Sequence, residues 1–158
     1  MIVLIDNYDS FTYNLFQMIG SIDTDIKVLR NDYVNQSMIY ELKPTKIVIS
    51  PGPGHPKDAG NTIELIRNFH DSISILGICL GHQAIGYSFG ASIIKAKSIE
   101  HGKVHEINHF GHDIFQLVYF HFSARPSLCL LCPLPSDFSR VCSGAQWCSL
   151  TVYHAQLS

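Results

Sequence analysis

The sequence predicts an α/β fold in which helices cover both faces of a parallel sheet. Short apolar runs alternate with helical patterns through about the first 90 residues, which is the order of βαβ units. The runs are apolar throughout rather than at every second residue, as expected of strands that are buried on both faces. A chain of 158 residues also has room for one domain with a sizeable core.

Local signals justify the elements in turn. Asp9 or Ser10 can cap a first helix, and Pro44 ends another because the residue before a proline avoids the helical region. Apolar residues at helical spacing predict inward faces, made of Phe11, Leu15, Met18, Ile19, Ile63, Ile66 and Phe69. The expected elements are a strand at 1–5, a helix to about 20, a strand at 26–29, a helix at 36–42, a strand at 46–49, a helix at 62–70, a strand at 73–78, a helix ending near 90, and antiparallel strands at 90–97 and 102–107.

Polar or glycine-rich segments follow three of the predicted strands. These segments are Asp6-Asn7, Ser50 to Gly54, and the turn around Cys79. Ligands of parallel sheets bind at the carboxyl ends of the strands. We therefore expect the three segments to open onto one edge of the sheet.

Cys79 lies between a predicted strand and a predicted helix, with Gly77 and Gly81 as its second neighbours. A nucleophile flanked by glycines at such a junction is typical of a nucleophile elbow, whose sharp turn exposes the middle residue. The dipole at the amino end of the helix favours the thiolate over the thiol. The alternative reading of the spacing is a small, buried, unreactive cysteine.

The segment 50–56 reads Ser-Pro-Gly-Pro-Gly-His-Pro and so cannot form regular structure. Gly52 and Gly54 would let a substrate approach the backbone N–H groups closely. The N–H of Leu80, directly after Cys79, supplies the second donor that an oxyanion hole needs. Beside Cys79 the segment therefore indicates acyl transfer, whereas without Cys79 it would be read as a stiff connection.

Charge and residue content disfavour several classes of function. The formal net charge of -2 gives no reason to expect nucleic acid or an anionic membrane as a partner. No apolar run reaches the roughly 18 residues of a membrane helix, and no basic signal segment opens the chain. We therefore expect a cytoplasmic protein, with the plastid stroma as an alternative. We expect no metal at the four histidines His101, His105, His109 and His112, which share no helical face with a carboxylate.

Four motifs occur in order: Asp-Asn-Tyr-Asp-Ser-Phe-Thr-Tyr-Asn at 6–14, Ser-Pro-Gly-Pro-Gly at 50–54, Gly-Ile-Cys-Leu-Gly-His-Gln at 77–83 and His-Gly-Lys at 101–103. Together they resemble the class I glutamine amidotransferases, and more narrowly the small subunits of anthranilate synthase and aminodeoxychorismate synthase. The resemblance covers residues 1–116. It implies a flavodoxin-like parallel sheet.

The resemblance also implies a chemistry. Cys79 attacks the side-chain amide of glutamine, ammonia leaves, and water hydrolyses the glutamyl thioester. Gly52, Gly54 and Leu80 match positions that bind the oxyanion and the glutamine backbone, and Gln83 matches a further glutamine contact. The resemblance implies no cofactor.

A partner subunit is implied as well. In the family, ammonia passes to a chorismate-binding large subunit, component I. His101, Gly102 and Lys103 match a loop that faces this partner. The sequence does not separate anthranilate from aminodeoxychorismate synthesis, because that choice belongs largely to the partner.

The family's base and its orienting group form a Phe-His-Pro-Glu motif, which residues 1–158 do not contain. The last glutamate is Glu106, and the echo at Tyr119-Phe120-His121-Phe122 has no glutamate after it. A cysteine nucleophile needs a base. We therefore expect this chain to be inactive or very weak. A degenerate binding or regulatory subunit is the alternative, and a related cysteine hydrolase is disfavoured by the segment 50–54 and Gln83.

Residues 117–158 differ in composition from the family-like part at 1–116. They contain no lysine and four of the five cysteines. We hypothesise that a shifted reading frame or an aberrant splice produced them. The rival interpretation is a zinc site, although its second cysteine pair is spaced by five, and its ligands would be Cys129, Cys132, Cys142 and Cys148.

Overall fold

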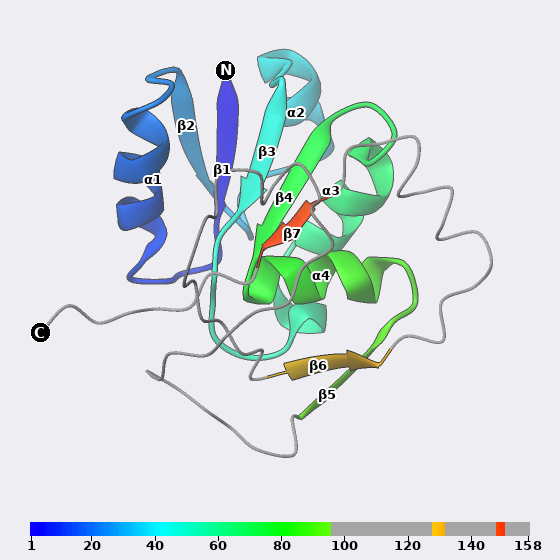
Figure 1. The fold of residues 1–158 in the computed structure, drawn as a ribbon. Coiled ribbons are helices and arrows are strands. Elements are labelled where there is room, and N and C mark those ends of the chain that lie inside the picture. Colours follow the sequence, from blue (N-terminus) through cyan, green and yellow to red (C-terminus); the bar gives the residue numbers. More distant parts are fainter. Residues whose placement is uncertain (96–127, 132–147, 151–158) are drawn as a thin grey trace, which may run out of the picture.

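A computed structural model describes residues 1–95, 128–131 and 148–150 (Figure 1). The predicted α/β fold with a parallel sheet is confirmed. In chain order its elements are β1 (Ile2–Asp6), α1 (Thr12–Gly20), β2 (Ile26–Arg30), α2 (Gln36–Leu42), β3 (Lys46–Ile49), the 3₁₀ helix η1 (Pro56–Asp58), α3 (Thr62–Phe69), β4 (Ser74–Ile78), α4 (Leu80–Ser88), β5 (Ser92–Lys95), β6 (Leu128–Leu131) and β7 (Cys148–Leu150).

The central sheet has five parallel strands in the order β2-β1-β3-β4-β7. This is the flavodoxin-like order, with β7 in the place of the fifth strand. Ile5 of β1 lies beside Ile49 of β3, and Ile49 lies beside Gly77 of β4. The carboxyl ends of these strands therefore meet at one edge of the sheet, as the sequence predicts (Figure 1).

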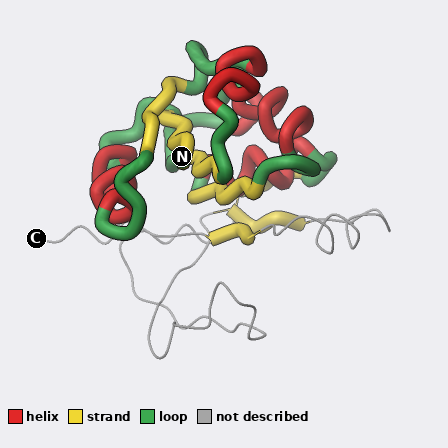
Figure 2. Tube along the Cα trace, turned by 90° about the horizontal axis from the view of Figure 1, so that it is seen from above, coloured by secondary structure: helices red, strands yellow, loops and turns green. Residues whose placement is uncertain are grey.

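Helices lie on both sides of the sheet (Figure 2). Successive residues of β1 point to opposite faces. Val3 and Ile5 pack in a cluster with side chains of α2, α3 and α4, whereas Ile2 and Leu4 pack with side chains of α1. Because both faces are covered, all four residues are buried, which explains why the strand is apolar throughout.

The first helix differs from the prediction in two respects. Its N-cap residue is Phe11, without a side-chain cap, whereas Asp9 Oδ1 accepts a hydrogen bond from the Phe11 N–H at 2.8 Å and so shapes the preceding turn. Met18, predicted to face inward, is 59% exposed, while Leu15 is buried. The helix packs along the edge strand β2, so among the described residues no second layer covers its outer side.

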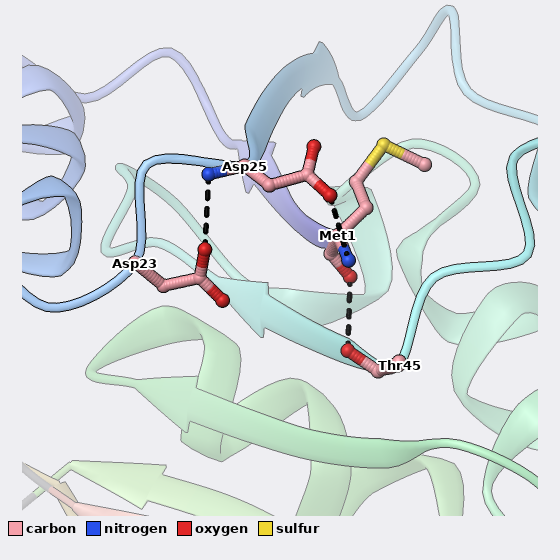
Figure 3. A network of polar contacts seen from close by, with 4 residues as sticks. All are labelled: Met1, Asp23, Asp25 and Thr45. Carbon is pink, nitrogen blue, oxygen red and sulfur yellow. Dashed lines mark hydrogen bonds and ion pairs between the residues drawn. The ribbon is translucent and has the colours of Figure 1, made fainter.

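Polar contacts connect the chain at the amino ends of the strands, opposite the end where the predicted site residues lie (Figure 3). The Met1 ammonium lies 3.0 Å from Asp25 Oδ2, and Thr45 Oγ1 donates to the Met1 carbonyl oxygen at 3.1 Å. Asp23 Oδ1 accepts from the Asp25 N–H at 3.0 Å. These contacts tie the start of β1 to the segments that precede β2 and β3.

β5 confirms the first of the two predicted antiparallel strands, and in the structure it pairs with β6. The second predicted strand at 102–107 and the four histidines lie outside the described residues. The side chains of the four C-terminal cysteines also lie outside the described residues, so the structure does not test the rival interpretation of a zinc site. Over the described ranges, no helix has both the length and the apolar surface that crossing a bilayer would require.

Candidate active site

Cys79 occupies the sharp turn between β4 and α4, with φ 52° and ψ -108°. A positive φ at a residue other than glycine is strained and persists only where its neighbours enforce it. A Cβ on Gly77 would lie 2.4 Å from the backbone carbon of Gly81, and a Cβ on Gly81 would lie 2.5 Å from the Ile49 carbonyl oxygen. The start of α4 therefore presses directly on the ends of β3 and β4, in the strand–turn–helix geometry that the glycine spacing predicts.

The segment after β3 reaches the same place. A Cβ on Gly52 would lie 2.5 Å from Asn7 Cβ and 2.7 Å from Leu80 Cδ2. Gly52 is thus wedged between the end of β1 and the first residue of α4. Farther along, the His55 ring contacts the Tyr87 ring of α4 edge-on, with centroids 5.5 Å apart. The three segments that the sequence places at one edge therefore come together around Gly52.

The other predicted site residues lie around this junction. Gly54 has φ +82°, and no heavy atom lies within 4 Å of the position a Cβ would take. Gln83 is half-buried on the first turn of α4, and its N–H donates to the Cys79 carbonyl oxygen at 3.0 Å. His101, Gly102 and Lys103 lie outside the described residues. In the part of the chain that the structure describes, no group of three or more His, Cys, Asp or Glu could hold a metal ion.

A buried polar network centred on Asn7 underlies the site. The Asn7 N–H donates to Ser50 Oγ and its Nδ2 donates to the Ser50 carbonyl oxygen, both at 2.9 Å. Asn7 Oδ1 accepts from Asn31 Nδ2 at 3.0 Å and from Thr62 Oγ1 at 3.4 Å. Neither Asn31 nor Thr62 is predicted from the sequence to belong to the site. The available signal was that Asn31 directly follows β2, and so ends at the same sheet edge.

The electrostatics at Cys79 differ from the sequence-based expectation. Burial raises the pKa of the Cys79 thiol, and the negative charge of Asp9 raises it further, whereas a backbone hydrogen bond from Leu80 lowers it. Cys79 packs against the apolar cluster beneath α1, so desolvation outweighs the helix terminus. The prediction of a favoured thiolate is therefore wrong, and the thiol must lose its proton to a base before it can attack.

Replacing Asp9 with Asn is expected to shift the alkylation of Cys79 by iodoacetamide to lower pH. The Asp9 carboxylate disfavours a second negative charge nearby, so its neutralisation lowers the thiol pKa. Asparagine keeps an oxygen that can accept the Phe11 N–H bond. The measurement is the rate of Cys79 alkylation from neutral to alkaline pH, followed by peptide mass spectrometry.

Asp71→Asn, at an exposed carboxylate before β4, is the control. A midpoint that stays in place or rises in D9N would contradict the assignment.

The model of the family "Glutamine amidotransferase class-I" matches residues 3–127. Anthranilate synthase component 2 of Pyropia yezoensis is 53% identical over 116 residues, which cover 73% of this chain and 61% of that protein. Aminodeoxychorismate/anthranilate synthase component 2 of Bacillus subtilis is 47% identical over 116 residues, which cover 73% of this chain and 60% of that protein. The chain thus spans about 61% of the length of the first of these relatives.

A solved structure agrees with these relatives. A protein from Thermoplasma acidophilum, described as one of the subunits of GMP synthase, superposes with a TM-score of 0.67 at 26% sequence identity, over 86% of this chain and 68% of that chain. The resemblance inferred from the four motifs is therefore confirmed at the level of the family and its fold. The chain belongs to the class I glutamine amidotransferase family.

Proposed function

We propose that this chain is a glutamine amidotransferase subunit in which Cys79 attacks the side-chain amide of glutamine. The observation that carries the proposal is the strained turn at Cys79, pressed against Gly52 through Leu80. The thiolate sulfur bonds to the amide carbon, and the amide nitrogen leaves as ammonia after taking up a proton. Water then cleaves the carbon–sulfur bond, which releases glutamate and restores the thiol.

Backbone N–H groups stabilise the oxygen that becomes negative during the attack. Leu80 supplies one of these groups, and the segment with Gly52 and Gly54 supplies the other, since Gly52 lies against the Leu80 side chain. Such preorganised donors contribute most of the electrostatic stabilisation in acyl transfer. Gln83, one turn into α4, contacts the bound glutamine.

The ammonia serves a chorismate-binding large subunit, component I, in anthranilate or aminodeoxychorismate synthesis. Support comes from the relatives, which are named component 2 of these synthases. By resemblance, His101, Gly102 and Lys103 match a family segment that faces this partner. One of the relatives carries both names in one protein, so this chain is proposed to serve either partner.

Hydrolysis by residues 1–158 alone is proposed to be very weak. Burial raises the pKa of the Cys79 thiol, so a base is needed, and these residues contain no Phe-His-Pro-Glu motif. General-base catalysis typically contributes about 10²–10⁴-fold. The alternative is a subunit that keeps the partner-facing surface and binds or regulates without turning over glutamine.

Two measurements test the proposal. A glutamine-analogue chloromethyl ketone is expected to alkylate Cys79, glutamine is expected to protect it, and Cys79→Ser is expected to lose the label. Continuing the chain through a family-type segment with the histidine and glutamate should raise glutamate release by about 10²–10⁴-fold. It should also support amination of chorismate with a large subunit. Labelling that glutamine does not slow would overturn the substrate, and fast hydrolysis by residues 1–158 would overturn the weak activity.

A second proposal concerns residues 117–158, which we propose arose from a shifted reading frame or an aberrant splice. Support comes from their composition, and the match to the family model extends no farther than residue 127. Translation of the coding DNA in its other frames should reveal a family-like continuation that contains Phe-His-Pro-Glu. If every frame lacks it, the proposal is wrong.

A further inference from the structure

We propose that Asn7 is a positioning residue that fixes the segment carrying the Gly52 N–H, an inference that rests on the glutamine chemistry proposed above. Asn7 follows β1 and is 2% exposed. It does not belong to the set of residues to which the resemblance gives a role in the reaction. Its contacts nevertheless run directly to the segment that faces Leu80.

Asn7 forms two hydrogen bonds with Ser50. Its backbone N–H donates to Ser50 Oγ, and its side-chain Nδ2 donates to the Ser50 carbonyl oxygen. Ser50 Oγ in turn donates to the Pro51 carbonyl oxygen at 2.7 Å. The proline ring fixes φ at Pro51. The backbone between the hydrogen-bonded Ser50 and the N–H of Gly52 therefore has little conformational freedom.

The side-chain oxygen of Asn7 is also hydrogen-bonded. Its Oδ1 accepts hydrogen bonds from Asn31 after β2 and from Thr62 at the start of α3. Asn7, Ser50 and Thr62 are each no more than 2% exposed, and hydrogen bonds are stronger electrostatically in such surroundings. The Asn7 side chain thus links the glycine segment to the residue that follows β2 and to the start of α3.

The backbone at Gly52 packs so tightly against Asn7 that no side chain fits between them. A Cβ on Gly52 would lie 2.5 Å from Asn7 Cβ and 2.9 Å from the Asn7 carbonyl oxygen. The backbone of the segment therefore rests on Asn7, with no side chain between them. Since an oxyanion donor works only when it is already in place, loosening Asn7 should impair recognition of the reacting carbonyl more than the reactivity of Cys79.

The test compares two rates of alkylation at Cys79 by peptide mass spectrometry. In the glutamine-analogue chloromethyl ketone, the thiolate sulfur bonds to the chloromethyl carbon and chloride leaves, while the ketone oxygen takes the oxyanion position. Iodoacetamide reports the reactivity of the thiol without that recognition. A change in the ratio of the two rates reports a change in the position of the segment, because a general change in the exposure of the thiol affects both rates.

Three variants carry the comparison. Asn7→Ala removes the Nδ2 and Oδ1 bonds and keeps Cβ, and Ser50→Ala removes the Oγ bonds. Thr12→Val is the control, because Thr12 is buried and its Oγ1 donates to Asp6 Oδ1 at 2.8 Å beside the same strand end. Thermal unfolding of each variant measures the purely structural cost of losing such a bond.

We expect the rate ratio to fall by at least about tenfold in Asn7→Ala, to fall in Ser50→Ala, and to stay unchanged in Thr12→Val. If Asn7→Ala does not fold, Ser50→Ala decides the question. A wild-type ratio retained in the folded variants would overturn the role of Asn7 alone. A wild-type chain whose labelling glutamine does not slow would overturn the proposed function, and the role of Asn7 with it.

Discussion

Gly77→Ala is expected to destabilise the chain by about 3 kcal/mol, at the upper end of the cost of overpacking. The added Cβ would lie 2.4 Å from the backbone carbon of Gly81, and 2.5 Å from the Gly81 oxygen and the His82 nitrogen. These are backbone atoms of the first turn of α4, which cannot rotate away as a side chain can. Either the elbow opens or α4 shifts from the sheet.

The free energy of unfolding, measured by urea denaturation and circular dichroism, checks this expectation. Gly81→Ala should have an effect of similar size, because its Cβ would lie 2.5 Å from the Ile49 carbonyl oxygen. Gly20→Ala is the matched control: its nearest neighbour would be Ile26 Cδ1 at 3.8 Å, and alanine favours the helix by up to about 1 kcal/mol. If Gly77→Ala proves as stable as Gly20→Ala, the close packing of Gly77 against the backbone of Gly81 and His82 is contradicted.

The elements that the sequence predicts best are those with local signals. The structure has α2 at Gln36–Leu42 and β3 at Lys46–Ile49, with the predicted boundaries. Asn35 caps α2 by accepting from the Met38 N–H at 3.0 Å, and Lys43, in the left-handed region, ends it. Pro44 after the helix and the apolar run of β3 are signals that act within a few residues, so sequence reasoning captures these boundaries.

The features that the sequence does not reveal depend on residues far apart in the chain. The bonds from Asn7 reach Ser50 and Thr62, 43 and 55 residues away. The raised pKa of Cys79 arises from burial and from Asp9, which α1 and the end of β1 bring close. The glycine spacing at the elbow is a local signal that predicts the turn. It carries no information on how dry the surroundings of the thiol are.

Gly52→Ala should lower labelling of Cys79 by the glutamine-analogue chloromethyl ketone by about 10²-fold, while iodoacetamide still reacts. The new Cβ would lie 2.7 Å from Leu80 Cδ2, the end of a side chain that can turn aside. It would also lie 2.5 Å from Asn7 Cβ and 2.9 Å from the Asn7 carbonyl oxygen. Hydrogen bonds from Asn31 and Thr62 hold Asn7 in place, so the segment with Gly52 must move away.

Both rates are measured at Cys79 by peptide mass spectrometry, with Gly20→Ala as the control for folding. Gly54→Ala separates steric displacement from backbone strain: its Cβ would meet no atom within 4 Å, but φ +82° is costly for alanine. We expect a smaller loss there than at Gly52. If both reagents slow equally in Gly52→Ala, the segment supports the fold around the thiol rather than recognition of the reacting carbonyl. A fall confined to the glutamine analogue would place the oxyanion donor at Gly52, because recognition of its glutamine part fixes the ketone oxygen of that reagent in the oxyanion position, whereas iodoacetamide has no glutamine part to be recognised.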